Sequence, residues 1–239
     1  MALDDPDGGA PVLAAAPLNL SELTKLSEMN QIWSGTAPQR CLIRMIDIAE
    51  VKGRDGPELR ASFRNPEAAQ ALPAGGIEQA IRDAVRNADP ARGIIAQAKE
   101  VIQRVKTFFT GSLLSPLDIE LVGEPTIIVF ILARPSNLEF SPVSKALTHK
   151  NLADRDGYGG LRHVTLVGDD YYEDPEPLED CRIVHFVCAP PPTPMPPPDS
   201  YGFKHGLNLN VRLKHPDDAD GTRRALDLMI DPDIRYPGQ

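Results

Sequence analysis

Hydrophobic residues recur with a helical period through much of the N-terminal half of the chain. Ile77 to Val85 and Ile94 to Phe109 each form an apolar stripe at spacings of three and four, which is typical of amphipathic helices. Asp89 and Pro90 between them are a favourable N-cap and first helical residue, so the pattern predicts two consecutive helices. The opposite faces carry charges of mixed sign, which indicate a solvated surface.

A shorter helix is predicted upstream of these two. Ser21 is a suitable N-cap, and apolar residues follow it at spacings of three and four as far as Trp33. We interpret this segment as a helix packed on its own domain. The alternative is a docking peptide that holds Trp33, the single tryptophan, as an anchor for a partner protein. Residues 1–19 show no period and are expected to form a mobile tail.

Residues 41–63 combine two patterns. Residues 41–51 are compatible with a helix or with a strand, because their apolar residues follow neither period strictly. The segment Gly53–Gly56 has strong turn chemistry, and residues 59–63 alternate between apolar and polar. We therefore predict a β-hairpin here.

The hydrophobic period changes to two after residue 124. Residues 126–133 are apolar without alternation, which predicts a strand buried on both faces and central in its sheet. Residues 161–167 and 182–188 are expected to form further strands. Residues 204–231 alternate on either side of a polar loop and predict a long hairpin with one solvated face.

Together these elements predict an α+β fold. A mobile tail (1–19) precedes a helical section (20–112), and a mainly antiparallel β-rich section (113–239) follows, as a sandwich-like or helix-covered sheet. We expect the helical and β-rich sections to form one cooperative unit.

A proline-rich arm, residues 189–199, interrupts the β-rich section. Because proline fixes φ and lacks an amide donor, this segment is expected to be an exposed, semi-rigid polyproline II loop. Pro191, Pro194 and Pro197 match the PxxP spacing that aromatic grooves recognise. A passive spacer is the preferred interpretation, and contact with another chain is the alternative.

Composition limits the range of partners and compartments. The chain of 239 residues has a net charge of −9, so nucleic acid and anionic membranes are not expected as partners. The longest apolar run is far shorter than the roughly 20 residues that span a bilayer. Three cysteines without a CxxC pair, and an acidic N-terminus unlike a secretory signal, predict a cytoplasmic protein.

The histidines are the candidate metal ligands. Strand alternation places His163 with Leu161 and His185 with Ile183, so the two rings could meet on one face if their strands are adjacent. Ordinary packed or surface histidines are the preferred interpretation, since no two histidines have the close spacing of a metal motif.

Residues 169–180 contain seven carboxylates and no basic residue, without the spacing of an EF-hand. We interpret them as a solvated acidic loop in which Tyr171 and Tyr172 could contact a basic partner.

Nucleophile and phosphate-binding motifs are absent from the sequence. The leading hypothesis is a non-enzymatic protein-binding or assembly protein, with other protein chains or further copies of itself as partners. The alternative is a metal-dependent hydrolase or lyase, whose histidine and aspartate ligands converge from separate strands. No cofactor is predicted beyond that metal ion.

Overall fold

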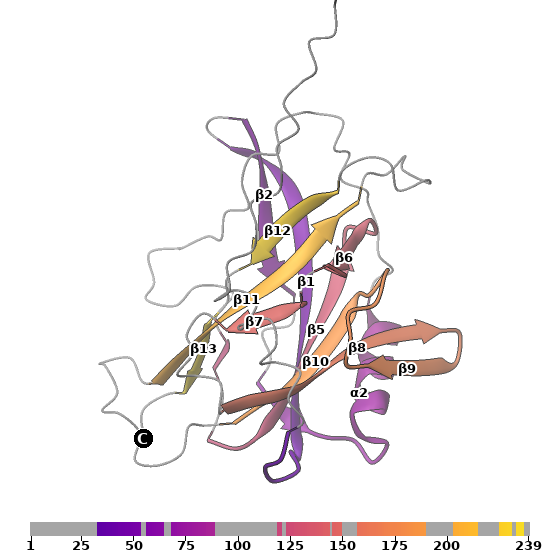
Figure 1. The fold of residues 1–239 in the computed structure, drawn as a ribbon, viewed down its shortest axis with the longest axis vertical. Coiled ribbons are helices and arrows are strands. Elements are labelled where there is room, and N and C mark those ends of the chain that lie inside the picture. The colour runs from indigo at the N-terminus through magenta and orange to yellow at the C-terminus, as the bar shows by residue number, and fades with distance from the viewer. Residues whose placement is uncertain are drawn as a thin grey trace, which may run out of the picture.

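The computed structural model describes ten segments of the chain, and the fold is stated for these alone. They are residues 33–53, 56–64, 68–88, 119–120, 123–143, 145–149, 157–189, 203–214, 225–230 and 233–236. Within them the protein consists of two β-sheets and one helix, α2 (Gly76–Asn87) (Figure 1).

The first sheet has seven strands within the described residues. Its order is β2-β1-β5-β10-β8-β9, and β3 also pairs with β1. The neighbours β1 and β5 are parallel, whereas every other pair in this sheet is antiparallel. The strands are β1 (Arg40–Gly53), β2 (Gly56–Phe63), β3 (Gln70–Ala71), β5 (Thr126–Arg134), β8 (Tyr158–Val167), β9 (Asp170–Asp174) and β10 (Ile183–Cys188).

The second sheet is built around β11 and has six strands within the described residues. Its order is β12-β11-β13-β4, while β6 and β7 also pair with β11. Its one parallel pair is β13 with β4. The strands are β4 (Ile119–Glu120), β6 (Leu138–Phe140), β7 (Leu147–His149), β11 (Phe203–Leu213), β12 (Leu226–Ile230) and β13 (Asp233–Tyr236).

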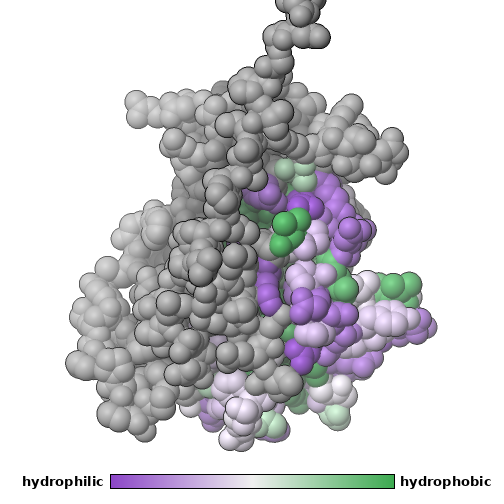
Figure 2. All heavy atoms as spheres, in the orientation of Figure 1, coloured by the Kyte–Doolittle hydropathy of each residue, from purple (hydrophilic) through white to green (hydrophobic). Residues whose placement is uncertain are grey.

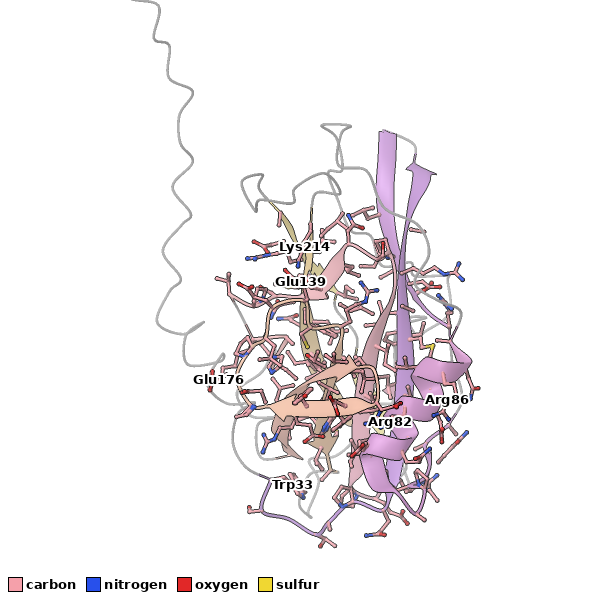
Figure 3. All side chains as sticks on the ribbon, turned by 90° about the vertical axis from the view of Figure 1, so that its right-hand side faces the viewer. Trp33, Arg82, Arg86, Glu139, Glu176 and Lys214 are labelled. Carbon is pink, nitrogen blue, oxygen red and sulfur yellow. The ribbon has the colours of Figure 1, made fainter. Side chains whose placement is uncertain are left out.

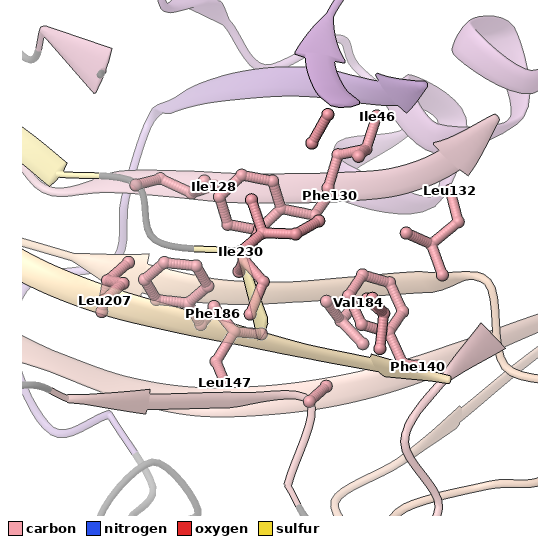
Figure 4. Packing of buried hydrophobic residues seen from close by; sticks show 14 of the residues in the cluster. Ile46, Ile128, Phe130, Leu132, Phe140, Leu147, Val184, Phe186, Leu207 and Ile230 are labelled. Carbon is pink, nitrogen blue, oxygen red and sulfur yellow. The ribbon is translucent and has the colours of Figure 1, made fainter. Parts of the chain in front are cut away.

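The main core lies between the two sheets. Figure 1 shows β11 and β12 crossing over β1 and β5, and Figure 4 shows the side chains that fill the space between the layers. Phe130 and Phe186 of the first sheet stack with ring centroids 6.1 Å apart and belong to one cluster with Phe140 and Leu207 of the second. Burying each of these phenylalanines contributes about 2–3 kcal/mol, so the two sheets are held together as a sandwich.

A second core covers the outer face of the first sheet, the face turned away from the second sheet. Ala80 and Ile81 of α2 pack there against Val129 and Ile131 of β5. Because β5 is covered by the second sheet on one side and by α2 on the other, both faces of the strand are apolar, as its uninterrupted hydrophobic run predicts.

The predicted α+β fold with an N-terminal helical section is wrong. The described residues are mostly in strands, and residues 40–53 and 56–63 of that section form β1 and β2. The reason is that β1 is itself covered on both faces, so its apolar residues show no clean period of two. The predicted helix at 94–109 and the one that begins at Ser21 lie outside the described residues, as does the tail.

The individual strand predictions fared better than the fold class. The hairpin is confirmed, since Gly53 pairs with Gly56 at its closed end. The predicted strands at 126–133, 161–167 and 182–188 correspond to β5, β8 and β10. The long hairpin is β11 paired with β12.

Candidate functional site

A cavity of about 520 Å³ lies on the outer face of the first sheet, between α2 and β1. Its floor includes Ile43 and Met45 on β1, which share a face because strand side chains alternate. Its roof is formed by Ala80 and Ala84, four residues apart on α2, and by Ala88, the residue that follows the helix. Because alanine side chains are short, the helix leaves open space above the strand. The volume lies within the range of roughly 300–1,000 Å³ that is typical of small-molecule sites.

Polar groups are concentrated on two walls of this cavity. Arg64 follows β2, and its Nε donates to Asp47 Oδ2 at 2.5 Å, with both side chains 20% exposed. Asp83 of α2 accepts hydrogen bonds from Gln79 at 2.9 Å and from Arg86 at 3.0 Å. Figure 3 shows Arg86 on the outer side of the helix. The cavity therefore combines a roof of alanines with a held guanidinium on one wall and a carboxylate on another.

Gln70 and Asn87 add neutral polar groups to the lining. Their amides can both donate and accept hydrogen bonds, which suits the edges of a heterocyclic base. A second cavity, beside Val85 and over β8 and β10, measures about 240 Å³ and has a mainly aliphatic lining. The larger, more polar cavity is the better candidate site.

A hydrogen-bonded chain of three side chains lies elsewhere on the outer face of the first sheet. Glu173 on β9 accepts from the Tyr171 hydroxyl and lies 2.9 Å from Nε2 of His185 on β10. The hydrogen bond with His185 lowers the pKa of Glu173 against the opposing effect of burial, and Tyr171 adds to the lowering. Burial and the bonded Glu173 raise the pKa of Tyr171.

Arg82 joins this chain to α2. Its guanidinium lies 5.8 Å from the centroid of the Tyr171 ring and donates to the Asp169 carbonyl at 2.7 Å (Figure 3). The interaction of a cation with an aromatic face, together with the hydrogen bond, fixes the helix against the turn between β8 and β9. The Tyr171 side chain is therefore bound by Arg82 and Glu173 of the same chain.

Tyr172, the other predicted contact residue, points to the opposite face of β9 and is 54% exposed. The prediction of a solvated acidic loop at residues 169–180 is therefore wrong in part, because residues 170–174 form the strand β9.

On the described part of the face in Figure 2, hydrophobic residues occur in small separate groups among polar ones.

The two candidate metal ligands do not meet. Strands β8 and β10 are adjacent, as the hypothesis required, but His163 pairs with Val184 and His185 pairs with Arg162. Paired residues share a face, so the His163 ring faces inward and the His185 ring faces outward. Among the described residues, no group of three or more His, Cys, Asp or Glu side chains is placed to hold a metal ion.

His163 is fully buried, and neither ring nitrogen has a hydrogen-bond partner of normal geometry within the described residues. Burial lowers the pKa of His163 below its usual value of 6.5, and the backbone of Asp174 partly offsets this. The unfolded chain therefore binds a proton at this position more readily than the folded protein. The stability of the fold is expected to decrease as the pH falls below 6.5.

His163 and His185 differ in hydrogen bonding, since only His185 has a well-formed bond, to Glu173, and the two residues therefore give a matched pair of substitutions. His163→Leu is expected to raise the free energy of unfolding by about 1 kcal/mol at pH 8 and by more at pH 5, because it removes buried nitrogens without a well-formed hydrogen bond and removes the proton uptake. His185→Leu is expected to lower it by about 1 kcal/mol, because Glu173 loses a partner. Urea denaturation at both pH values measures the two effects. Equal destabilisation by both substitutions would contradict the prediction.

The other predicted contact residues fall into two groups. Trp33 is half-buried against the outer-face cluster, and its Nε1 donates to the Thr36 carbonyl at 3.2 Å. Figure 3 shows it beside the first sheet. Pro191, Pro194 and Pro197 lie outside the described residues.

A charged cluster that joins β6, the end of β11 and the turn before β10 was not anticipated from the sequence. Glu139 on β6 is buried and lies 2.9 Å from Lys214 Nζ, which also contacts Asp180 (Figure 3). Burial opposes the charge on Lys214, but its hydrogen bonds to Asp180 and Glu139 outweigh burial and raise its pKa. These residues lie at least 34 positions apart, so no local spacing pattern could have revealed the cluster.

The fold and the cavity define a β-sandwich protein with a ligand-sized site under its helix. The model of the pNTSase1 family, described as a predicted novel nucleotide synthetase, matches residues 65–239, and the chain belongs to this family. No curated protein matches the chain. The described residues contain no helix long and apolar enough to cross a membrane.

Family membership corrects the functional hypotheses drawn from the sequence. It indicates a nucleotide-related enzyme, so the non-enzymatic protein-binding or assembly role is wrong. The alternative of a metal-dependent hydrolase or lyase is likewise unsupported. The matched residues include α2, the roof of the cavity, whereas β1, its floor, precedes them.

Proposed function

We propose that this protein is an enzyme that synthesises a nucleotide, and that the cavity between α2 and β1 holds its phosphorylated substrate. The observation that carries the proposal is the family match over residues 65–239. The sequence alone could not suggest it, because the chain has no glycine-rich phosphate-binding motif.

The geometry of the cavity supports this function in two respects. A volume of about 520 Å³ is sufficient for a mononucleotide. Arg64 supplies a cation whose direction is set by Asp47, and a guanidinium group donates charge-assisted hydrogen bonds to phosphate oxygens. These features support binding of a phosphorylated substrate without the usual phosphate-binding loop.

The test is a product assay with the purified chain. The protein is incubated with Mg²⁺ and nucleoside triphosphates, alone and in pairs, and the products are separated by ion-exchange chromatography and identified by mass. We expect a new nucleotide product, formed at a rate proportional to protein concentration. Arg64→Ala is expected to reduce kcat/KM at least about tenfold, because it removes a charge-assisted contact with phosphate.

Arg212→Ala is the matched control. Arg212 has a similar exposure, 23%, and also pairs with an aspartate, Asp227 at 3.4 Å, but it lies on β11 in the second sheet. Its variant is expected to keep the activity of the original protein. The absence of any nucleotide product under all substrate combinations would refute the proposed function.

A further inference from the structure

We propose that the cavity binds its nucleotide in one direction, with the base in the slot between α2 and β1 and the 5′-phosphate on Arg64. This inference rests on the proposed function and assigns the parts of the substrate to particular walls of the site. Its substrate class is a nucleoside 5′-phosphate.

The slot has the shape and chemistry that a flat base requires. Ala80 and Ala84 present methyl groups in one row on α2, with Ala88 just after the helix, and Ile43 and Met45 present aliphatic and thioether surface opposite them. Burial of an aromatic ring between such surfaces is favourable, and sulfur makes additional contacts with ring edges. Larger side chains in the roof would close the slot.

Charge determines which way the ligand lies. Arg64 is the one cationic side chain among the described residues that line the cavity, and Asp83 on α2 is the one anionic side chain. Both charges are paired, Arg64 with Asp47 and Asp83 with Arg86, but a guanidinium donates hydrogen bonds to phosphate oxygens whereas a carboxylate only accepts them, so the phosphate binds at the wall formed by Arg64. The amide of Asn87 can meet the polar edge of the base or the ribose hydroxyls.

The ion pair with Asp47 makes Arg64 a suitable phosphate ligand. Its Nε is occupied by Asp47 at 2.5 Å, which fixes the plane of the guanidinium before any ligand arrives. Both side chains are mostly buried, so water screens a bound phosphate less than it would on an open surface. An arginine fixed in this way loses little conformational entropy on binding.

The first experiment separates the phosphate from the rest of the ligand. Binding of the four common ribonucleosides and of their 5′-monophosphates is measured by isothermal titration calorimetry. We expect at least one monophosphate to bind the original protein about tenfold more tightly than its nucleoside. In Arg64→Gln the two should bind within about twofold of each other, whereas Arg212→Gln should retain the full difference.

The second experiment tests the slot. Ala84→Leu adds bulk to the roof and is expected to weaken binding of both nucleoside and monophosphate at least about tenfold. Val85→Leu is the control, because Val85 neighbours Ala84 but does not line this cavity. Thermal melting of each variant shows whether the fold is retained, and an Ala84→Gln variant replaces Ala84→Leu if the latter does not fold.

The outcomes distinguish this inference from the proposed function. If the protein forms a nucleotide product while Arg64→Gln and Ala84→Leu bind nucleotides normally, the inference is wrong and the proposed function stands. If nucleotides bind in the cavity as described but no product is ever formed, the function is wrong and the inference stands. Failure of all ribonucleosides and monophosphates to bind the original protein overturns the inference.

Discussion

Val129→Asp is expected to prevent folding. Val129 is fully buried on β5, and β5 has paired neighbours on both sides, β1 and β10. The new carboxylate would face the mainly apolar cluster under α2, and its cross-strand neighbour His185 is already bonded to Glu173. Burying an unpaired charge costs several kcal/mol, which is comparable with the 5–15 kcal/mol total stability of a typical domain.

Circular dichroism and thermal melting of the purified variant provide the measurement. Val143→Asp is the control, because Val143 is 76% exposed and the same substitution should change the free energy of unfolding by no more than about 0.5 kcal/mol. A soluble Val129→Asp protein that melts cooperatively near the original temperature would show that β5 is not central to the fold.

Arg182→Ala has the second largest expected effect, a loss of roughly 3–5 kcal/mol in the free energy of unfolding. The guanidinium of Arg182 donates to four carbonyls around the connection from β5 to β6. These are Ser136 at 2.7 Å, Leu138 at 2.6 Å, Leu132 at 2.5 Å and Pro135 at 3.0 Å. Burial lowers the pKa of Arg182, yet its many hydrogen bonds satisfy the donors of the group.

Urea denaturation measures this loss, with an unchanged m-value showing that the transition remains two-state. Arg182→Lys should recover only a small part of it, because an ammonium group cannot span four carbonyls as a planar guanidinium does. Arg86→Ala is the control, since Arg86 is 70% exposed and its ion pair with Asp83 contributes little. A loss below 1 kcal/mol in Arg182→Ala would mean that water replaces the arginine without cost.

The candidate site shows which structural features a local sequence pattern can predict and which it cannot. The apolar stripe on α2, including Ala80 and Ala84, is visible in the sequence and correctly predicts the buried face of that helix. The cavity is not visible, because its floor on β1 precedes α2 by more than thirty residues and lies there only through the pairing of β1 with β5. The ion pair of Asp47 with Arg64 likewise depends on the register of the hairpin.

His163 and His185 show the same limit of prediction from local sequence patterns. Alternation along each strand correctly groups His163 with Leu161 and His185 with Ile183. Whether the two groups share a face depends on the register between β8 and β10, and a shift of one residue reverses the answer. The structure pairs His163 with Val184, so the two rings are on opposite faces.

The sequence by itself therefore determined local conformation where a single environment acts along a segment. The uninterrupted apolar run of β5, the turn chemistry of the β1–β2 hairpin and the alternation of β11 each follow from residue type and spacing. Only the tertiary structure decided which strands are neighbours, which face of β1 meets α2 and which meets the second sheet, and where a cavity remains. The reason is physical: β1 is buried on both faces, so its residues satisfy either period, and the choice is made by the packing partners rather than by the segment itself.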